Sequence, residues 1–292
     1  MNAVKSELAP GLYLVATPIG NARDITLRAL DVLAGADVLA AEDTRSLRRL
    51  LDIHGVALGN RPLIAYHDHN TDKARPRLLD EIAQGRSVAY ASEAGTPLIS
   101  DPGFDLVRAA REAGLPVTSA PGAVAAITAL SIAGLPTDRF FFAGFLPATA
   151  SARKSALRDL APVAATLVLY ESPRRLAALL TEACDLLGAD RPAAVCRELT
   201  KKFEETRRDT LQALAAHYAE TPPKGEVVVL IGKGDSPKLN EMDLETEVRG
   251  ALQRMSVRDA ADDVSGRLGL KRRVVYQLAM RIASENDSGT ER

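Results

Sequence analysis

Short apolar runs and helix-type segments alternate strictly through the first 120 residues of this chain of 292 residues. The apolar runs predict five strands, at Leu12–Ala16, Ala36–Ala41, Leu63–Tyr66, Ser87–Ala91 and Pro116–Ser119. The segments between them predict helices at Ile25–Ala34, Ser46–Ile53, Asp72–Gln84 and Phe104–Ala113. Four glycines are expected to end these helices as left-handed caps, namely Gly35, Gly55, Gly85 and Gly114. Strands that alternate with helices form a mainly parallel sheet with covered faces.

A second set of strands follows a helical stretch at Ala123–Ala133. The strands are expected at Phe140–Phe145, Thr166–Glu171, Ala193–Leu199 and Val227–Gly232, with an antiparallel partner to the third inside KKFEETRRDT. These patterns predict an α/β domain with a mainly parallel sheet over residues 1–119 and a mixed-sheet α/β domain over 120–234. The segment GKGDSPKLNEM has the composition of a linker.

The tail, residues 240–285, has a helical pattern and no strand signal. Ser256 is expected to cap one helix, a Gly-Leu turn follows, and the next helix opens with Lys271, Arg272 and Arg273. This pattern resembles a helix-turn-helix that faces nucleic acid, although a small helical cap on the preceding domain explains it equally well.

Composition narrows the class of protein. Hydrophobic residues make up 46% and charged residues 26% of the chain, and the net charge of −1 gives no general attraction for nucleic acid. The apolar runs are too short for a membrane span and the N-terminus lacks an apolar signal core, so we expect a cytoplasmic protein without a membrane partner. The two cysteines, Cys184 and Cys196, lack metal-site spacing and are expected to be buried thiols.

Three loops rich in glycine and proline follow predicted strands: TPIGNARD, YASEAGTPLISDPG and SAPGAVAAI. Ligands of open α/β sheets bind beyond the carboxyl ends of the strands, where such loops let backbone approach a ligand. The chain lacks a P-loop and a GxGxxG fingerprint, and His67 and His69 lack a third metal ligand, so no metal site is expected. The loops favour a zwitterionic, nucleoside-bearing small molecule.

Several separated motifs carry a resemblance to a known family. In order along the chain they are LYLVATPIGNARDITLRAL, AEDTRSLRRLL, YASEAGTPLISDPG, SAPGAVAAITALSIAGLP, FFFAGFLP, ESPRRL and RELTKKFEE. From Leu12 to about Gly234 the chain resembles the tetrapyrrole methylase superfamily, and most closely its branch that methylates a cytidine 2′-hydroxyl in 16S ribosomal RNA. Two positions depart from the family pattern, because SEAGTP replaces SDAGTP and PGAVA replaces PGPSA.

The resemblance implies two α/β domains of the class III methyltransferase type, plus a small C-terminal helical domain. It also implies S-adenosylmethionine as cofactor, 16S ribosomal RNA or the assembled small ribosomal subunit as partner, and a homodimer. By motif position, the expected cofactor-binding residues are Pro18, Ile19, Ala94, Gly95, Thr96, Ile99, Val124, Ala125, Glu171, Leu199 and Val227.

Catalytic candidates follow the strand ends on the same side of the sheet. Asp43 is expected to act as base or orienter and Arg45 to contact phosphate or ribose, with Glu42, His69 and Asn70 nearby. A helix N-cap at Glu42-Asp43-Thr44 explains the AEDTR motif nearly as well. Two other functions remain open at this point: a precorrin-type tetrapyrrole methyltransferase, and a non-catalytic RNA-binding factor for ribosome assembly.

Overall fold

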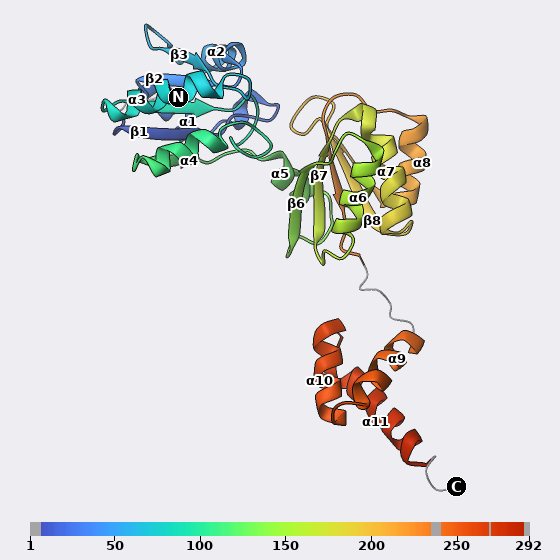
Figure 1. Cartoon of the computed structure of the whole chain (residues 1–292). Coiled ribbons are helices and arrows are strands. Elements are labelled where there is room, and N and C mark those ends of the chain that lie inside the picture. The colour runs from blue at the N-terminus through green and yellow to red at the C-terminus, as the bar shows by residue number, and fades with distance from the viewer. Residues whose placement is uncertain (1–6, 235–240, 269, 289–292) are drawn as a thin grey trace. The chain divides into compact units, whose positions relative to one another are not determined.

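The computed structural model describes residues 7–234, 241–268 and 270–288 (Figure 1). Met1–Lys233 forms one compact unit and Gly234–Arg292 a second. Most of the expected linker, and Gly269 of the expected turn, lie outside the described residues. None of the helices that the structure describes combines the length and apolar character that a bilayer crossing requires.

The first sheet contains five strands, which all pair in parallel in the order β3-β2-β4-β1-β5. They are β1 (Gly11–Val15), β2 (Val38–Ala41), β3 (Leu63–Ala65), β4 (Ser87–Ala91) and β5 (Val117–Ala120). The connecting helices are η1 (Ala22–Asp24), α1 (Leu27–Gly35), α2 (Thr44–Ile53), α3 (Thr71–Ala83) and α4 (Phe104–Glu112). One buried cluster packs α1 and α2 on one face of the sheet, and another packs α3 and α4 on the other. The expected parallel sheet with covered faces is therefore confirmed.

The second sheet is mixed, in the order β6-β7-β10-β8-β9, and only its β6–β7 pair is parallel. Its strands are β6 (Phe140–Phe145), β7 (Thr166–Glu171), β8 (Pro192–Arg197), β9 (Glu205–Thr210) and β10 (Val227–Ile231). The helices are α5 (Ala125–Ile132), α6 (Ala150–Leu160), α7 (Pro173–Leu187) and α8 (Leu211–Glu220). Helices α6, α7 and α8 share one core cluster, whereas α5 packs on the opposite face. Strand β9 is the expected antiparallel partner of β8.

The second unit contains α9 (Glu241–Leu252), α10 (Val257–Leu268) and α11 (Arg272–Ser288) around an apolar core of their own. Ser256 caps α10, because its hydroxyl oxygen accepts a hydrogen bond from Asp259 N at 3.2 Å. The fold class of two α/β sheets with a C-terminal helical domain is confirmed. We retain the division near residue 119 as a proposal: β5 ends there, yet both sheets pack into one unit.

The expected helix caps are only partly correct. Gly55, Gly85 and Gly114 have φ of +66°, +85° and +70°, the left-handed conformation that favours glycine. Gly35 is instead the last residue of α1, and the chain leaves that helix through extended backbone at Ala36. The expectation of two buried thiols also fails at Cys184, which is only half-buried.

Candidate cofactor site

The loops after β1 and β4 are joined by their backbones. Thr17 N donates to Gly95 O at 2.9 Å and Gly95 N donates back to Thr17 O at 3.1 Å. Ser92 Oγ also donates to Gly95 O, at 2.7 Å. Gly95 has φ of +83°, which a residue with a Cβ adopts at a cost. The two loops therefore form one fixed edge at the carboxyl ends of the parallel strands.

Loops of both sheets meet at this edge. A Cβ on Gly122 would lie 2.8 Å from Ala16 Cβ, so the Pro-Gly corner after β5 fits against β1 only without a side chain. A Cβ on Gly20 would lie 2.6 Å from Thr200 Oγ1, in the loop after β8. Asn21 N donates to the same Thr200 hydroxyl at 3.0 Å. These close contacts set the walls of a pocket.

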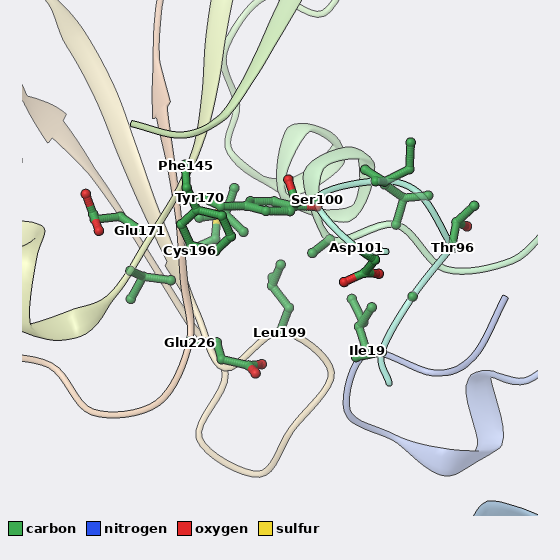
Figure 2. Close-up of a pocket in the computed structure, with 17 residues that line it drawn as sticks. Ile19, Thr96, Ser100, Asp101, Phe145, Tyr170, Glu171, Cys196, Leu199 and Glu226 are labelled. Carbon is green, nitrogen blue, oxygen red and sulfur yellow. The ribbon is translucent and has the colours of Figure 1, made fainter. Parts of the chain in front are cut away.

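Figure 2 shows this pocket, with Ile19, Thr96 and Asp101 facing Tyr170 and Glu171 of the second sheet. Ten of the eleven expected cofactor residues line it: Ile19, Ala94, Gly95, Thr96, Ile99, Val124, Ala125, Glu171, Leu199 and Val227. Pro18 does not; it lines a neighbouring groove between the β1–α1 loop and α2. The structure thus brings together residues that lie up to 208 positions apart in the sequence, from Ile19 to Val227.

The charge of the pocket has one sign. Its lining includes the carboxylates of Asp101, Glu171 and Glu226, and none of the described lining residues is a lysine or arginine. Glu171 Oε1 accepts from Ser172 N at 2.7 Å and pairs with Arg175 Nε at 3.1 Å. Its Oε2 is buried without a hydrogen-bond partner. Such a lining suits a cation and offers no basic side chain to a phosphate, although Lys201 pairs with Glu226 at 2.8 Å as Arg175 does with Glu171.

Asp101 is the most perturbed carboxyl group in the pocket. Burial, and then the nearby charges of Glu42 and Glu93, raises the pKa of Asp101 to about 7. The loop that carries it is strained, because Leu98 and Ser100 have φ of +72° and +64°. Strained backbone and perturbed carboxyl groups concentrate at functional sites.

The AEDTR candidates take up structural positions outside the pocket. Asp43 is the N-cap of α2, where it accepts from Arg45 N at 2.8 Å and pairs with the Arg45 guanidinium at 3.3 Å. The hydrogen bonds from Arg45 lower the pKa of Asp43. Glu42 Oε2 accepts from Glu93 N at 3.3 Å and so supports the loop after β4, while burial raises the pKa of Glu42. The N-cap interpretation therefore describes what Asp43 does in the fold.

The remaining two candidates lie in the β3–α3 loop. Asn70 Oδ1 accepts from His67 N at 3.0 Å and Asn70 Nδ2 donates to Ala65 O at 2.9 Å, which stabilises that loop. His69 is exposed, with its ring 6.0 Å from that of His67. None of the five catalytic candidates is among the described residues that line the pocket.

Several lining residues were not expected from the sequence: Ser100, Asp101, Phe145, Tyr170, Cys196, Glu226 and Val228. Asp101 and Phe145 lie inside SDPG and GFLP, which belong to the family motifs, but the sequence did not predict that these two side chains line the pocket. A polar residue in a loop after a buried strand was the available signal for Asp101.

Comparison with solved structures identifies the fold. A uroporphyrin-III-C-methyltransferase from Thermus thermophilus superposes with a TM-score of 0.55 at 25% identity, over 77% of this chain and 94% of that one. Another structure of uroporphyrin-III C-methyltransferase from Thermus thermophilus, complexed with S-adenosylhomocysteine, gives a TM-score of 0.54 at 21% identity, over 76% of this chain and 97% of that one. The two-sheet fold is thus that of the tetrapyrrole methylases.

The family follows from the sequence comparisons. Residues 11–215 match the model of Tetrapyrrole (Corrin/Porphyrin) Methylases, and residues 240–283 match that of the RsmI C-terminal HTH domain. A ribosomal RNA small subunit methyltransferase I of Mesorhizobium japonicum is 45% identical over 97% of this chain and 95% of its own length. The protein of the same name from Haemophilus influenzae is 41% identical over 94% and 98%. The chain belongs to the tetrapyrrole methylase family, in the branch of the ribosomal RNA small subunit methyltransferases I.

Proposed function

We propose that this protein transfers a methyl group from S-adenosylmethionine to the ribose 2′-hydroxyl of a cytidine in 16S ribosomal RNA. The relatives just named support methylation of small-subunit RNA. The observation that carries the proposal is the pocket lined by acidic and apolar side chains, which the loops of the family motifs form.

The pocket fits this cofactor. S-adenosylmethionine carries a sulfonium and an ammonium group against one carboxylate, so it is cationic overall, and the pocket offers Asp101, Glu171 and Glu226. The unpartnered Oε2 of Glu171 leaves one acceptor available for a donor of the ligand. The ten lining residues from Ile19 to Val227 would hold it, while Pro18, in the loop after β1, lines the neighbouring groove. When bound, the cofactor supplies an electrophilic methyl group.

The residues of the chain then have three tasks: they position the ribose hydroxyl, exclude water and accept a proton. Positioning the reacting atoms about 3–3.5 Å apart provides much of the acceleration in such a displacement. Apolar side chains such as Ile19, Leu199 and Val227 exclude water from the reacting atoms. We assign the proton to Asp101 in place of Asp43, because Asp101 lines the pocket. Its pKa is about 7 in the ligand-free protein and falls when the cationic cofactor binds, so the carboxylate is ionised and can accept a proton.

A ribosomal substrate is favoured over a tetrapyrrole. The tetrapyrrole methylases of known structure share at most 25% identity with this chain in the two comparisons above, whereas the RNA methyltransferase relatives share 41–45% over nearly the full length. The C-terminal domain model adds weight, because it matches the three-helix unit. We further propose that the protein acts as a homodimer in the cytoplasm.

The tail would supply the RNA contacts that the net charge of −1 does not. Arg272 forms an ion pair with Asp262 and its guanidinium lies 5.7 Å from the Tyr276 ring centre. Lys271 and Arg273 are exposed at the start of α11 and suit phosphate contacts.

Truncation after Gly234 should spare cofactor affinity and make the salt dependence of RNA binding shallower. The double variant Lys271→Ala, Arg273→Ala should reproduce much of that change. Equal RNA affinity and salt slope for full-length and truncated protein would assign the tail to a covering role.

Transfer of radiolabelled methyl groups by the purified protein tests the reaction. The acceptors to compare are protein-free 16S ribosomal RNA, small ribosomal subunits and uroporphyrinogen III, with nucleoside analysis of the product. We expect 2′-O-methylcytidine from one of the two ribosomal acceptors. Methylation of the tetrapyrrole alone, or S-adenosylmethionine binding without any transfer, would favour one of the two alternative functions.

A further inference from the structure

A bulge in strand β6 changes the direction of Phe145. Phe142 pairs with Val168 of β7, but Gly144 pairs with Leu169 and Phe145 with Tyr170, so Ala143 is the extra residue. In a regular strand Phe142 and Phe145, three positions apart, would point to opposite faces of the sheet. The bulge returns Phe145 to the face of Phe142 and Tyr170. Bulges often re-aim a side chain beside a functional site.

The ring of Phe145 rests on a fixed support and leaves much of its surface open. Its centroid lies 5.6 Å from that of Tyr170 in an edge-type contact, and the Phe142 ring lies 5.0 Å from Tyr170 on the same face. The Tyr170 hydroxyl oxygen accepts from Ala126 N at 3.1 Å, which holds Tyr170 in place. Phe145 is nevertheless 57% exposed, and it lines the pocket beside Tyr170 (Figure 2).

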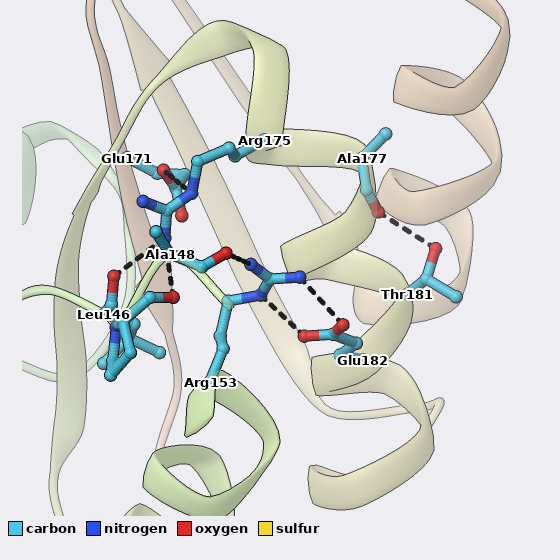
Figure 3. Close-up of polar contacts among 9 residues, drawn as sticks. Leu146, Ala148, Arg153, Glu171, Arg175, Ala177, Thr181 and Glu182 are labelled. Atoms are coloured by element: carbon cyan, nitrogen blue, oxygen red, sulfur yellow. Dashed lines mark hydrogen bonds and ion pairs between the residues drawn. The ribbon is translucent and has the colours of Figure 1, made fainter. Parts of the chain in front are cut away.

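Two arginines hold the chain directly after Phe145. Arg175 Nη2 donates to Leu146 O at 2.7 Å and to Pro147 O at 3.1 Å, and Arg175 pairs with Glu171 (Figure 3). Arg153 Nη1 donates to Ala148 O at 3.1 Å, and its ion pair with Glu182 is buried. Three consecutive carbonyl groups are thus bound by guanidinium groups that are themselves paired with carboxylates. The backbone that follows Phe145 is therefore fixed at three successive positions.

The opposite wall of the pocket lies close to the same point. A Cβ on Gly144, which has φ of +61°, would lie 3.3 Å from Ser100 Oγ, next to Asp101. The backbone beside Phe145 therefore lies against the loop that carries the proposed proton acceptor, and Phe145 and Asp101 line the same pocket.

We propose that the base of the target nucleotide stacks on Phe145 during methyl transfer, and that Arg175 is the positioning residue for that ring. The inference rests on the proposed function. A ribose hydroxyl that reaches a methyl group in the pocket brings its own base, one sugar carbon away, to the pocket wall. Unstacked bases in RNA are commonly bound on aromatic side chains.

The alternatives fit the observations less well. The described lining residues include no lysine or arginine to pair with a phosphate, so sugar and base are the parts of the RNA suited to this wall. Tyr170, the other aromatic residue among the described lining residues, already has its hydroxyl bonded to the backbone and its ring contacted by Phe142 and Phe145. The adenine of the cofactor and a second copy of the chain are competing occupants that the experiment below distinguishes.

The chain contains no tryptophan, which permits a single optical probe. Position 145 is replaced by 5-hydroxytryptophan, whose red-edge absorption separates it from the tryptophans of ribosomal proteins. The matched control places the same residue at Phe140, which is 44% exposed on the same strand but outside the pocket. Emission is recorded with S-adenosylhomocysteine alone, and then with the ribosomal acceptor that the wild-type protein methylates.

We expect the acceptor to quench the probe at 145 and not the probe at 140, and S-adenosylhomocysteine alone to cause little change. Phe145→Ala should lower kcat/KM for the acceptor about 5- to 150-fold, the equivalent of one stacked base, with Phe145→Tyr close to wild type. The cofactor Kd of Phe145→Ala should stay within about twofold, since its stacking partner is the RNA base.

Three results would overturn the inference: full quenching by S-adenosylhomocysteine alone, equal response of the two probes, or dissociation of an oligomer by Phe145→Ala. Quenching by S-adenosylhomocysteine alone would show that Phe145 contacts the adenine of the cofactor. Dissociation of an oligomer would show that Phe145 contacts a second subunit. If instead the wild-type protein methylates neither ribosomal acceptor, the proposed function itself fails.

Arg175→Lys tests the positioning role separately. A lysine ammonium cannot reproduce the planar guanidinium that bonds two carbonyls and a carboxylate. We expect faster depolarisation of the probe at 145 and a raised KM for the acceptor, with kcat less affected. Cofactor Kd is measured beside them, because Arg175 also pairs with Glu171 of the pocket. Unchanged probe mobility and KM would show that Arg175 acts only in packing.

Discussion

Cofactor binding should depend on pH through Asp101. Burial and the carboxylates of Glu42 and Glu93 raise its pKa to about 7, so half of the ligand-free molecules carry a proton there at neutral pH. A bound cation favours the ionised carboxylate and lowers that pKa, because the two charges attract. Below about pH 7 binding must therefore expel a proton, and affinity should fall by up to about tenfold per pH unit.

Between about pH 7 and pH 5.5 the expected loss is up to about 15-fold in affinity, because half of the ligand-free protein is already protonated at pH 7. Titration calorimetry with S-adenosylhomocysteine and S-adenosylmethionine measures it, and buffers of different ionisation enthalpy count the released proton. Asp101→Asn should bind more weakly at neutral pH and show a much flatter profile. Glu112→Gln is the matched control, because its exposed carboxylate lies outside the pocket lining and is not among the groups that raise the pKa of Asp101. Parallel pH profiles for wild type and Asp101→Asn would refute the reasoning.

The same carboxyl group should lower the stability of the ligand-free protein. Its folded-state pKa lies above the usual value of 3.8, so its stabilising contribution is present at low pH and is lost as pH rises through about 7. The loss develops between about pH 3.8 and pH 7, so Asp101→Asn should melt above wild type at about pH 8 and close to it at about pH 4. Calorimetric melting without cofactor measures the difference, and a lower melting temperature of the variant at both pH values would contradict this sign.

Three further variants test the scaffold. Arg153→Met should lower the free energy of unfolding by about 3–5 kcal/mol, because it leaves Glu182 buried and unpaired. Replacing both Arg153 and Glu182 by apolar residues should recover most of that loss. A loss below about 1 kcal/mol for the single variant in chemical denaturation would contradict the reasoning. Ser256→Ala should lower the free energy of unfolding of the tail by about 1 kcal/mol, because it removes the cap of α10, and it should leave cofactor affinity unchanged. We expect faster hydrogen exchange only in α10 and the helices that pack on it, and unaltered exchange there would count against the cap. Gly95→Ala should lower both cofactor affinity and melting temperature, because φ is +83° and the new Cβ would lie 3.3 Å from Ile19 Cγ2; a variant with wild-type values of both would show that the loop tolerates a side chain.

The sheets could be predicted because their signals are local. Alternating apolar and helical segments placed β4 at Ser87–Ala91 without error, and β9 was found from alternation within KKFEETRRDT. Gly35 was mistaken for a left-handed cap because glycine there marks a helix end without fixing the conformation that follows.

The site was only partly predictable because its chemistry depends on distant pairs. The pKa of Asp101 is raised first by burial and then by the charge of Glu42, which follows β2 and not β4, and nothing in the local sequence shows either effect. The bulge at Ala143 is equally hidden, since FFFAGF also suits a regular strand. Asp43 was favoured as base from its motif, and in the structure it caps α2, as the alternative interpretation of that motif expected.

Mapping of 2′-O-methylation across 16S ribosomal RNA tests the central claim most directly. RNA is compared from cells that contain the gene, cells that lack it, and deleted cells that express either wild-type protein or Asp101→Asn. We predict that one cytidine loses its ribose methyl group on deletion, regains it with the wild-type gene, and stays largely unmodified with the variant. Identical ribose-methylation maps with and without the gene would contradict the proposed function.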